Sequence, residues 1–137
     1  MIRPILVDTD VIIDHLRGFE NSKKLLKEVE LGNFLAYFST ITEAELYSGQ
    51  RMSVKSEQRI VERLLKIMHR VDVNSEIARK AGELRREYGV ELPNAIIAAT
   101  ALILGAELVT RNIKHYKSIK KIKLKTPDAI TKNFYAK

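Results

Sequence analysis

The feature that most constrains this chain is a short apolar run near its amino terminus that ends in two acids. Ile5-Leu6-Val7 is followed directly by Asp8, Thr9 and Asp10. An apolar run of this length, followed by residues that favour turns and helix starts, is typical of a buried parallel strand, which we expect over residues 4–8. Open α/β sheets bind ligands beyond the carboxyl ends of their strands. The two carboxylates therefore predict a site for a hard cation or for one nucleophilic acid.

The rest of the chain alternates apolar runs with amphipathic segments, as expected for a parallel sheet covered on both faces. Further strands are predicted over residues 34–39, 71–73, 107–110 and 122–124, the last at an edge because its lysines suit one. Helices are predicted over residues 11–16, 22–31, 42–49, 56–68, 74–88 and 93–104, with a helical turn at 112–117. The expected N-caps are Asp10, Ser22, Thr42 and Asn74. The fold class is α/β, and residues 1–137 are expected to form a single domain.

The composition excludes several classes of protein. The chain has no cysteine, so neither a disulfide framework nor a thiolate metal site is possible, and a cytoplasmic location is the default. The amino-terminal apolar run is too short for a signal peptide and is interrupted by Asp8 and Asp10. No stretch of about 18 apolar residues is present, so no membrane span is expected.

The net charge of +7 is unevenly distributed along the chain. From Arg111 to the end there are nine Lys and Arg residues and one acid, Asp128. A one-sided basic surface suits a polyanion such as RNA or DNA. The alternative is a solvated, lysine-rich segment that binds nothing.

Polar residues stand at the end of an apolar element in four places. They are Asp8 with Asp10, Glu45, Asn94, and Asn112 in the run Thr110-Arg111-Asn112. In a doubly wound sheet such positions crowd onto one edge. Oxygen ligands without His or Cys suit Mg²⁺ or Mn²⁺ rather than zinc. Ions of this kind activate water for attack on a phosphodiester and neutralise charge in the transition state.

The motifs around these residues resemble those of the PIN domains, specifically the VapC toxins of bacterial and archaeal toxin–antitoxin pairs. The similar segments are residues 6–14 (LVDTDVIID), 41–49 (ITEAELYSG), 92–101 (LPNAIIAATA) and 108–116 (LVTRNIKHY). They occur in the family's order and cover nearly the whole chain. One such motif alone would be weak support, whereas the four together are highly specific.

The resemblance implies a metal-dependent endoribonuclease with a three-layer α/β/α fold around a mostly parallel sheet of four to five strands. It also implies a homodimer that is inhibited by a cognate VapB-like antitoxin. By position in the motifs, Asp8, Glu45 and Asn94 would face a Mg²⁺ or Mn²⁺ ion, and Asn112 would complete the candidate catalytic residues. Asp8 is the expected direct ligand. Glu45 would bind a second ion or orient the attacking water.

Asn94 departs from the family pattern, which carries Asp at this point of the third motif. An amide offers a carbonyl oxygen but no negative charge. Metal binding should therefore be weaker, and occupancy by two ions should suffer most. Glu91, three residues earlier, is an alternative source of charge, but we expect it on the preceding loop.

Two other functions stay open at this point. One is a PIN-fold protein with lost or reduced activity that still binds RNA and its antitoxin. The other is a phosphatase similar to the haloacid dehalogenases, in which Asp8 is the nucleophile and Ser39 or Thr40 follows the second strand. That class requires a late acidic pair, which is absent from residues 109–112.

Several of these residues also have ordinary structural explanations. Asp10 is expected to cap a helix or to support the site rather than to bind the ion directly. His115 is expected to have a structural role rather than to act as a general base. Four aromatic residues are expected in the core or in a dimer contact rather than as base-stacking platforms: Tyr37, Phe38, Tyr47 and Tyr116.

Overall fold

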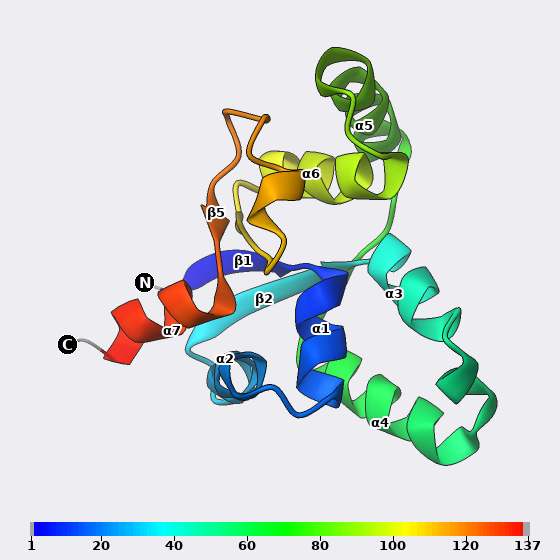
Figure 1. Cartoon of the computed structure of the whole chain (residues 1–137), viewed down its shortest axis with the longest axis vertical. Helices are drawn as coiled ribbons and strands as arrows, with labels where there is room; N and C mark the ends of the chain where they lie inside the picture. Colours follow the sequence, from blue (N-terminus) through cyan, green and yellow to red (C-terminus); the bar gives the residue numbers. More distant parts are fainter. Residues whose placement is uncertain (1, 136–137) are drawn as a thin grey trace.

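A single five-stranded parallel sheet with strand order β3-β2-β1-β4-β5 organises the fold (Figure 1). The computed structural model describes residues 2–135; Lys137, one of the basic residues counted above, lies outside them. The strands are β1 (Arg3–Val7), β2 (Phe34–Ser39), β3 (His69–Val71), β4 (Glu107–Val109) and β5 (Leu124–Lys125). The helices are α1 (Thr9–Leu16), α2 (Glu20–Glu30), α3 (Thr40–Tyr47), α4 (Lys55–Lys66), α5 (Ser75–Tyr88), α6 (Leu92–Leu104) and α7 (Pro127–Tyr135), with 3-10 turns η1 (Gln50–Ser53) and η2 (Ile113–His115).

Helices cover both faces of the sheet and give it two separate cores. In β1 the side chains alternate, so that Ile5 and Val7 enter one core and Leu6 enters the other. The first core is completed mainly by α1, α2 and α4, and the second by α5 and α6. Figure 1 shows these two groups of helices on opposite sides of the strands. The predicted three-layer α/β/α fold with a parallel sheet is therefore confirmed.

The α6 helix contributes five buried residues to the second core. Ala95, Ala98, Ala99 and Ala101 are all at most 1% exposed, and such small side chains let the helix approach its neighbours closely. This packing fixes the helix start, and with it Asn94, at the carboxyl-end edge of the sheet. Within the described part of the chain no single helix is long and apolar enough to cross a membrane; only α5 and α6 together pass such a test, and they are bent by 118°.

Three of the predicted N-caps are wrong. Asp8, not Asp10, caps α1, and Ser39, not Thr42, caps α3. In both cases the strand passes into the helix without a loop, so the residue directly before the helix keeps an extended backbone and becomes the cap. Ser22 lies inside α2, which begins at Glu20, and it is buried. The fourth cap, Asn74, is confirmed by its bond to the Ile77 N–H.

The carboxyl-terminal third differs most from the prediction. The edge strand is confirmed, but it comprises Leu124–Lys125 rather than residues 122–124, and β3 ends at Val71 where the prediction began. The helix α7 was not predicted. Its start carries a recognisable signal, because Pro127 occupies the first turn and Thr126 accepts a hydrogen bond from the Ala129 N–H. Ile130 then anchors α7 in the first core.

Candidate metal site at the carboxyl ends of the strands

The candidate site lies where β1 and β4 end side by side. The strand order reverses at β1, since β2 lies on one side of it and β4 on the other, and such a point is where open sheets bind ligands. The Asp8 N–H donates to the Val109 carbonyl at 3.0 Å, which aligns the two strand ends. Asp8 then caps α1 by accepting from the Thr9 N–H at 2.8 Å.

The Asp8 carboxylate is almost fully enclosed and fully hydrogen-bonded at one oxygen. Asp8 is 7% exposed, and its Oδ2 accepts from the hydroxyls of Thr110 at 2.9 Å and Tyr116 at 2.8 Å. Burial raises the pKa of Asp8, while the hydrogen bonds from Tyr116, Thr110 and Thr9 act in the opposite direction. Oδ1 of Asp8 accepts only from the Thr9 N–H, so this oxygen keeps a lone pair that a cation could use.

Tyr116 joins Asp8 to Asn94. The phenol oxygen lies 2.8 Å from Asp8 Oδ2 and 3.2 Å from Asn94 Oδ1, and the side chain of Tyr116 is completely buried. A phenol has one proton, so it donates one hydrogen bond at a time, and the nearer acceptor is the Asp8 carboxylate. The Asn94 amide can turn its NH₂ group toward the phenol oxygen and donate a hydrogen bond to it. A carboxylate at position 94 could only accept, and it would compete with Asp8 for the single hydrogen bond that the phenol donates. Burial and the charge of Asp8 raise the pKa of Tyr116 far above its ordinary range, so the proton stays on the phenol.

Glu45 is held by Thr9, the residue that follows Asp8, and not by Asp8 itself. Thr9 Oγ1 lies 2.7 Å from Glu45 Oε1 and 2.9 Å from Thr42 Oγ1. Thr9 and Thr42 are buried, whereas Glu45 stands on the exposed face of α3. Glu45 of α3 is therefore joined, through Thr9, to the residue that directly follows Asp8 at the β1–α1 junction.

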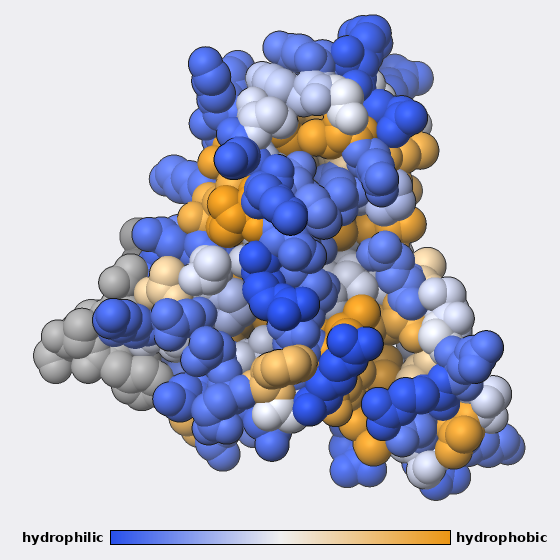
Figure 2. All heavy atoms as spheres, in the orientation of Figure 1, coloured by the Kyte–Doolittle hydropathy of each residue, from blue (hydrophilic) through white to orange (hydrophobic). Residues whose placement is uncertain are grey.

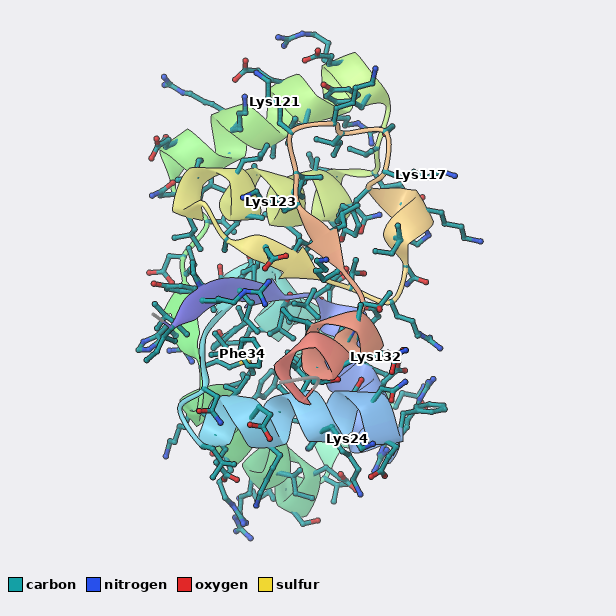
Figure 3. All side chains as sticks on the ribbon, turned by 90° about the vertical axis from the view of Figure 1, so that its left-hand side faces the viewer. Lys24, Phe34, Lys117, Lys121, Lys123 and Lys132 are labelled. Carbon is teal, nitrogen blue, oxygen red and sulfur yellow. The ribbon has the colours of Figure 1, made fainter. Side chains whose placement is uncertain are left out.

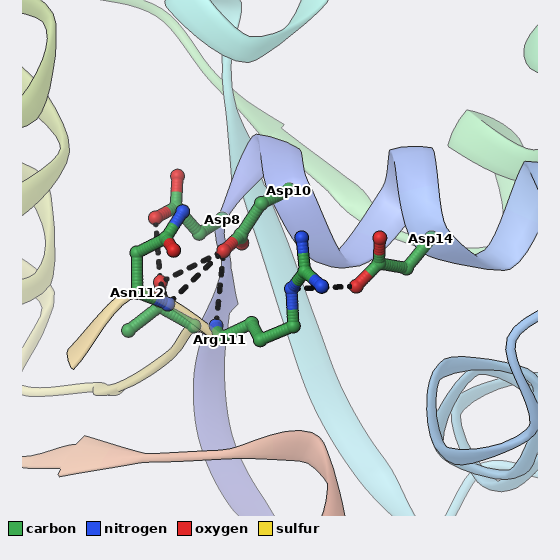
Figure 4. Close-up of polar contacts among 6 residues, drawn as sticks. Asp8, Asp10, Asp14, Arg111 and Asn112 are labelled. Atoms are coloured by element: carbon green, nitrogen blue, oxygen red, sulfur yellow. Dashed lines mark hydrogen bonds and ion pairs between the residues drawn. The ribbon is translucent and has the colours of Figure 1, made fainter.

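The carboxylate of Asp10 binds the backbone of the fourth motif (Figure 4). Its Oδ2 accepts from the N–H groups of Arg111 at 3.0 Å and Asn112 at 3.2 Å. One turn further along α1, buried Asp14 pairs with the Arg111 guanidinium at 3.0 Å. Burial, and then repulsion by Asp8, raise the pKa of Asp10 to about 6. Asp10 Oδ1 is buried and has no hydrogen-bond partner among the described residues, which is unusual for a carboxylate oxygen.

The predicted site residues meet this arrangement in different ways. Asp8 and Asn94 share Tyr116, and Glu45 is tied to the residue next to Asp8. Asn112 lies at the same edge, but its bonds to Asp10 and Thr110 come from its backbone N–H rather than its side chain. Glu91, the residue at the N-cap of α6, is exposed and does not join the cluster.

The sequence interpretation missed the hydroxyl groups that orient the acids. Thr9, Thr110 and Tyr116 each contact a candidate acid directly. Thr9 and Thr110 stand beside acids or at a strand end, which is a usable signal. Tyr116 ends the fourth motif, but nothing in the sequence connects its hydroxyl with Asp8, which is 108 residues away. The expectation that Tyr116 lies in the core is confirmed, as it is for Phe38, but it did not foresee the contact with Asp8.

The donor set suits a hard cation with few protein ligands. Two carboxylates, Asp8 and Glu45, and one amide, Asn94, supply only oxygen, and Mg²⁺ is commonly held by one or two carboxylates with waters completing its shell. No group of three or more His, Cys, Asp or Glu side chains is placed to hold a metal in residues 2–135. Asp10, whose buried Oδ1 has no hydrogen-bond partner among residues 2–135, adds negative potential close to Asp8.

An α/β/α sheet with acidic and amide oxygens at its topological switch point defines a class of candidate metal-dependent enzymes. Comparison with known proteins narrows it: the PIN domain family matches residues 5–122, and the chain belongs to that family. It is 36% identical over 124 residues to Ribonuclease VapC10 of Mycobacterium tuberculosis, covering 87% of this chain and 90% of that protein. It is 33% identical over 116 residues to Ribonuclease VapC19 of the same species, covering 81% and 90%.

Solved structures give the same result. A toxin–antitoxin complex from Klebsiella pneumoniae superposes with a TM-score of 0.74 and 32% identity, covering 90% of this chain and 97% of that one. VapBC2 from Rickettsia felis, bound to a DNA fragment from their promoter, superposes with a TM-score of 0.75 and 26% identity, covering 90% and 98%. The phosphatase alternative finds no support in these comparisons, and Ser39 serves as the cap of α3.

Proposed function

We propose that this protein is a divalent-metal-dependent endoribonuclease, the toxin of a VapBC-type toxin–antitoxin pair. The observation that carries the proposal is the approach of Asp8, Asn94 and Glu45 to one edge of the sheet in a PIN-family chain. Asp8 and Asn94 lie within 3.2 Å of the same phenol oxygen, and Glu45 is bound by the residue next to Asp8. The relatives named as ribonucleases support the reaction and the substrate class.

The residues would divide the work by their surroundings. Asp8 and Glu45 would hold the Mg²⁺ or Mn²⁺ ion with the oxygen of Asn94. When bound, the ion supplies an activated water and neutralises charge on the phosphate. Asp8 is oriented by its hydrogen bonds to Thr110 and Tyr116, so its position is set before any ligand arrives. Glu45 is exposed and can turn toward a water that attacks the phosphodiester. Asn112 lies at the rim, where its side chain is available to the RNA.

A second function is favoured by Asn94. The site has one carboxylate fewer than the family pattern, and a neutral amide contributes less to the binding of a divalent ion. The same fold with little or no activity would still bind RNA and its antitoxin. The two functions differ in one measurable property, which is whether this chain cleaves RNA when the metal is supplied.

The deciding experiment is a titration of Mg²⁺ and Mn²⁺ into the purified protein with a mixed pool of RNA. Asp8→Ala is the negative control, and Asn94→Asp restores the family acid. Metal-dependent cleavage that Asp8→Ala abolishes supports the ribonuclease. Cleavage by Asn94→Asp alone supports the impaired binding protein. If Asp8→Ala cleaves as well as the parent chain, Asp8 is not part of the machinery and the proposed site is rejected.

The proposed partners follow from the relatives and from the surface. Structures similar to this one were solved as toxin–antitoxin complexes, which supports a VapB-like antitoxin.

A cavity of about 260 Å³ opens beside Glu45, lined by apolar side chains that include Ile13, Leu16 and Met52. Figure 2 shows apolar surface between α1 and the α3–α4 region, as one of several apolar patches on this face. A homodimer and a cytoplasmic location complete the proposal, and light scattering on the purified chain tests the first.

A further inference from the structure

All the excess positive charge of the chain lies in one short segment. Residues 111–125 contain seven Lys and Arg residues and no acid. The whole chain has 24 basic and 17 acidic residues, so the rest of it has 17 of each and no net charge. A charge of +7 concentrated in 15 residues creates a local field that the remaining surface does not share.

The segment is anchored in the core at every third residue. Tyr116, Ile119 and Ile122 are at most 9% exposed and pack in the second core. Backbone bonds join these anchors in turn, from the Ile119 N–H to the Tyr116 carbonyl and from the Ile122 N–H to the Ile119 carbonyl. Each anchor is followed directly by an exposed lysine: Lys117, Lys120 and Lys123. The lysines are thus carried by a fixed backbone and not by a loose tail.

Both ends of the segment are bound at the candidate site. At its start, the Arg111 N–H donates to Asp10, two residues from Asp8. At its end, the Thr110 N–H donates to the Lys125 carbonyl at 3.0 Å, and the hydroxyl of the same Thr110 donates to Asp8. Lys114 lies two residues beyond Asn112, so its Cα is within about 7 Å of the Asn112 Cα along the chain. The charged segment therefore begins and ends beside the reacting groups.

These lysines are free to bind a ligand. Lys114, Lys117, Lys120, Lys121 and Lys123 are exposed. Within residues 2–135 none of these five lysines forms an ion pair. The ion pairs there are made by arginine, with Glu107, Glu57, Glu43 and Asp14. Figure 3 shows Lys117, Lys121 and Lys123 along the segment between η2 and β5, with Lys132 on α7 and Lys24 on α2 further along the same face.

We propose that Lys114, Lys117, Lys120, Lys121 and Lys123 form a lysine track that binds the phosphate backbone of single-stranded RNA and leads it to or from the Asp8 edge. The identity of the polyanion rests on the proposed ribonuclease function. Phosphate contacts of this kind set the position of a nucleic acid without reading its sequence. The fixed backbone lowers the conformational entropy lost on binding, because only the lysine side chains need to be ordered.

The alternative explanation is that the lysines protect an edge strand from pairing with other chains. The observed strand β5 has only two residues, Leu124 and Lys125, whereas four of the five track lysines lie outside it and away from its immediate ends. Edge protection therefore explains Lys123 but not the repeat of an anchor followed by a lysine.

The test measures RNA binding without cleavage. A fluorescent single-stranded RNA is titrated in EDTA at several salt concentrations with the parent chain, with the triple variant Lys117→Gln/Lys120→Gln/Lys123→Gln, and with a control triple variant. The control is Lys55→Gln/Lys66→Gln/Lys80→Gln on α4 and α5, which removes the same net charge. Each phosphate contact contributes about 0.7 to the slope of log affinity against log salt for a single strand, so the track variant should lose about 2 from that slope. Its affinity at 0.1 M salt should fall roughly tenfold to a hundredfold, and the control should change little.

Each outcome decides the proposal. A slope that falls in the track variant alone supports it, whether or not Mg²⁺ later produces cleavage, so the result is separate from the test of the enzyme. Equal slopes in the two triple variants, or no RNA binding by the parent chain, overturn it. If the track variant keeps its RNA affinity but loses affinity for poly-glutamate, the lysines form a surface for an acidic protein and the proposal fails. The three single Lys→Gln variants, each expected to lower the slope by about 0.7, guard against misfolding of the triple variant.

Discussion

Asp8 and Glu45 are two acids of one candidate site, but the protein treats them in opposite ways. Asp8 is enclosed, and its carboxylate is fixed by three donors: the Thr9 N–H, the Thr110 hydroxyl and the Tyr116 hydroxyl. Glu45 stands on an exposed helix face and has a single side-chain contact, with Thr9. Burial raises the pKa of Asp8 and so makes its charge costly for the fold. The comparison teaches that the site combines an enclosed acid whose charge opposes folding with an exposed acid that is held by one contact.

The largest expected effect comes from Asp8→Asn. The change removes a charge at the proposed metal position, so metal-dependent cleavage should fall by more than about a hundredfold, beyond the effect typical of supporting groups. The metal-free protein should be as stable as the parent chain or more stable, because a buried charge is replaced by an amide of the same shape. Cleavage assays and thermal unfolding in EDTA measure the two effects.

Glu45→Gln is the matched change on the exposed side. It should also reduce cleavage, but the melting temperature in EDTA should stay within a degree or two of the parent value, because the side chain is exposed. A clear loss of stability in Asp8→Asn, larger than that in Glu45→Gln, would contradict the view that the Asp8 charge opposes folding.

The contrast between the two acids also explains what the sequence could predict. The strand-end rule located Asp8, Asn94 and Asn112 at one edge because it depends only on the order of the elements. The same rule and the second motif identified Glu45, which the structure connects to this edge through Thr9, the residue between Asp8 and Asp10. These predictions rest on local patterns, which is why the sheet and its edge were predicted well.

Contacts that depend on packing were not predictable. Tyr116 was expected in the core, but the direction of its hydroxyl is set by how the segment after β4 packs against α6. The helix α7 was missed for a related reason: its buried face is short, with Ile130 as its main anchor, so its apolar pattern is weak. The caps at Asp8 and Ser39 were displaced because each helix begins within one or two residues of the end of the preceding strand, with no loop between them.

Tyr116→Phe sharpens the comparison, because it removes one oxygen from the enclosed side alone. Asp8 Oδ2 loses one of two donors and Asn94 loses its contact, so cleavage should fall about tenfold, as is typical when a group that supports a metal ligand is removed. The Mg²⁺ concentration for half-maximal rate should change with it, since Asp8 is less well oriented.

Tyr47→Phe is the control for Tyr116→Phe. Tyr47 is 37% exposed, and the charged groups that act on it are Glu62, Glu43 and Arg70 rather than Asp8. Asn94→Asp provides a second comparison. With a carboxylate at position 94, two acids compete for the one phenol proton, so losing the hydroxyl should change activity by a different factor than in the parent chain. Identical factors in the two backgrounds would show that Tyr116 does not couple Asp8 to Asn94.

The smallest expected effect concerns Asp10, which binds the backbone N–H groups of Arg111 and Asn112. Burial and the neighbouring Asp8 raise the pKa of Asp10 from its ordinary value of 3.8 to about 6, so the folded protein takes up a proton before the unfolded chain does. Stability is therefore gained as the pH falls through 6 toward 4, and that gain is absent above pH 7. Between pH 7 and pH 5 in EDTA, the parent chain should gain about 1 kcal/mol relative to Asp10→Asn. Urea unfolding of both proteins at the two pH values measures this difference. Parallel changes in the two proteins would mean that Asp10 is not the group that titrates, and that the unpartnered Oδ1 does not weaken the ionised form.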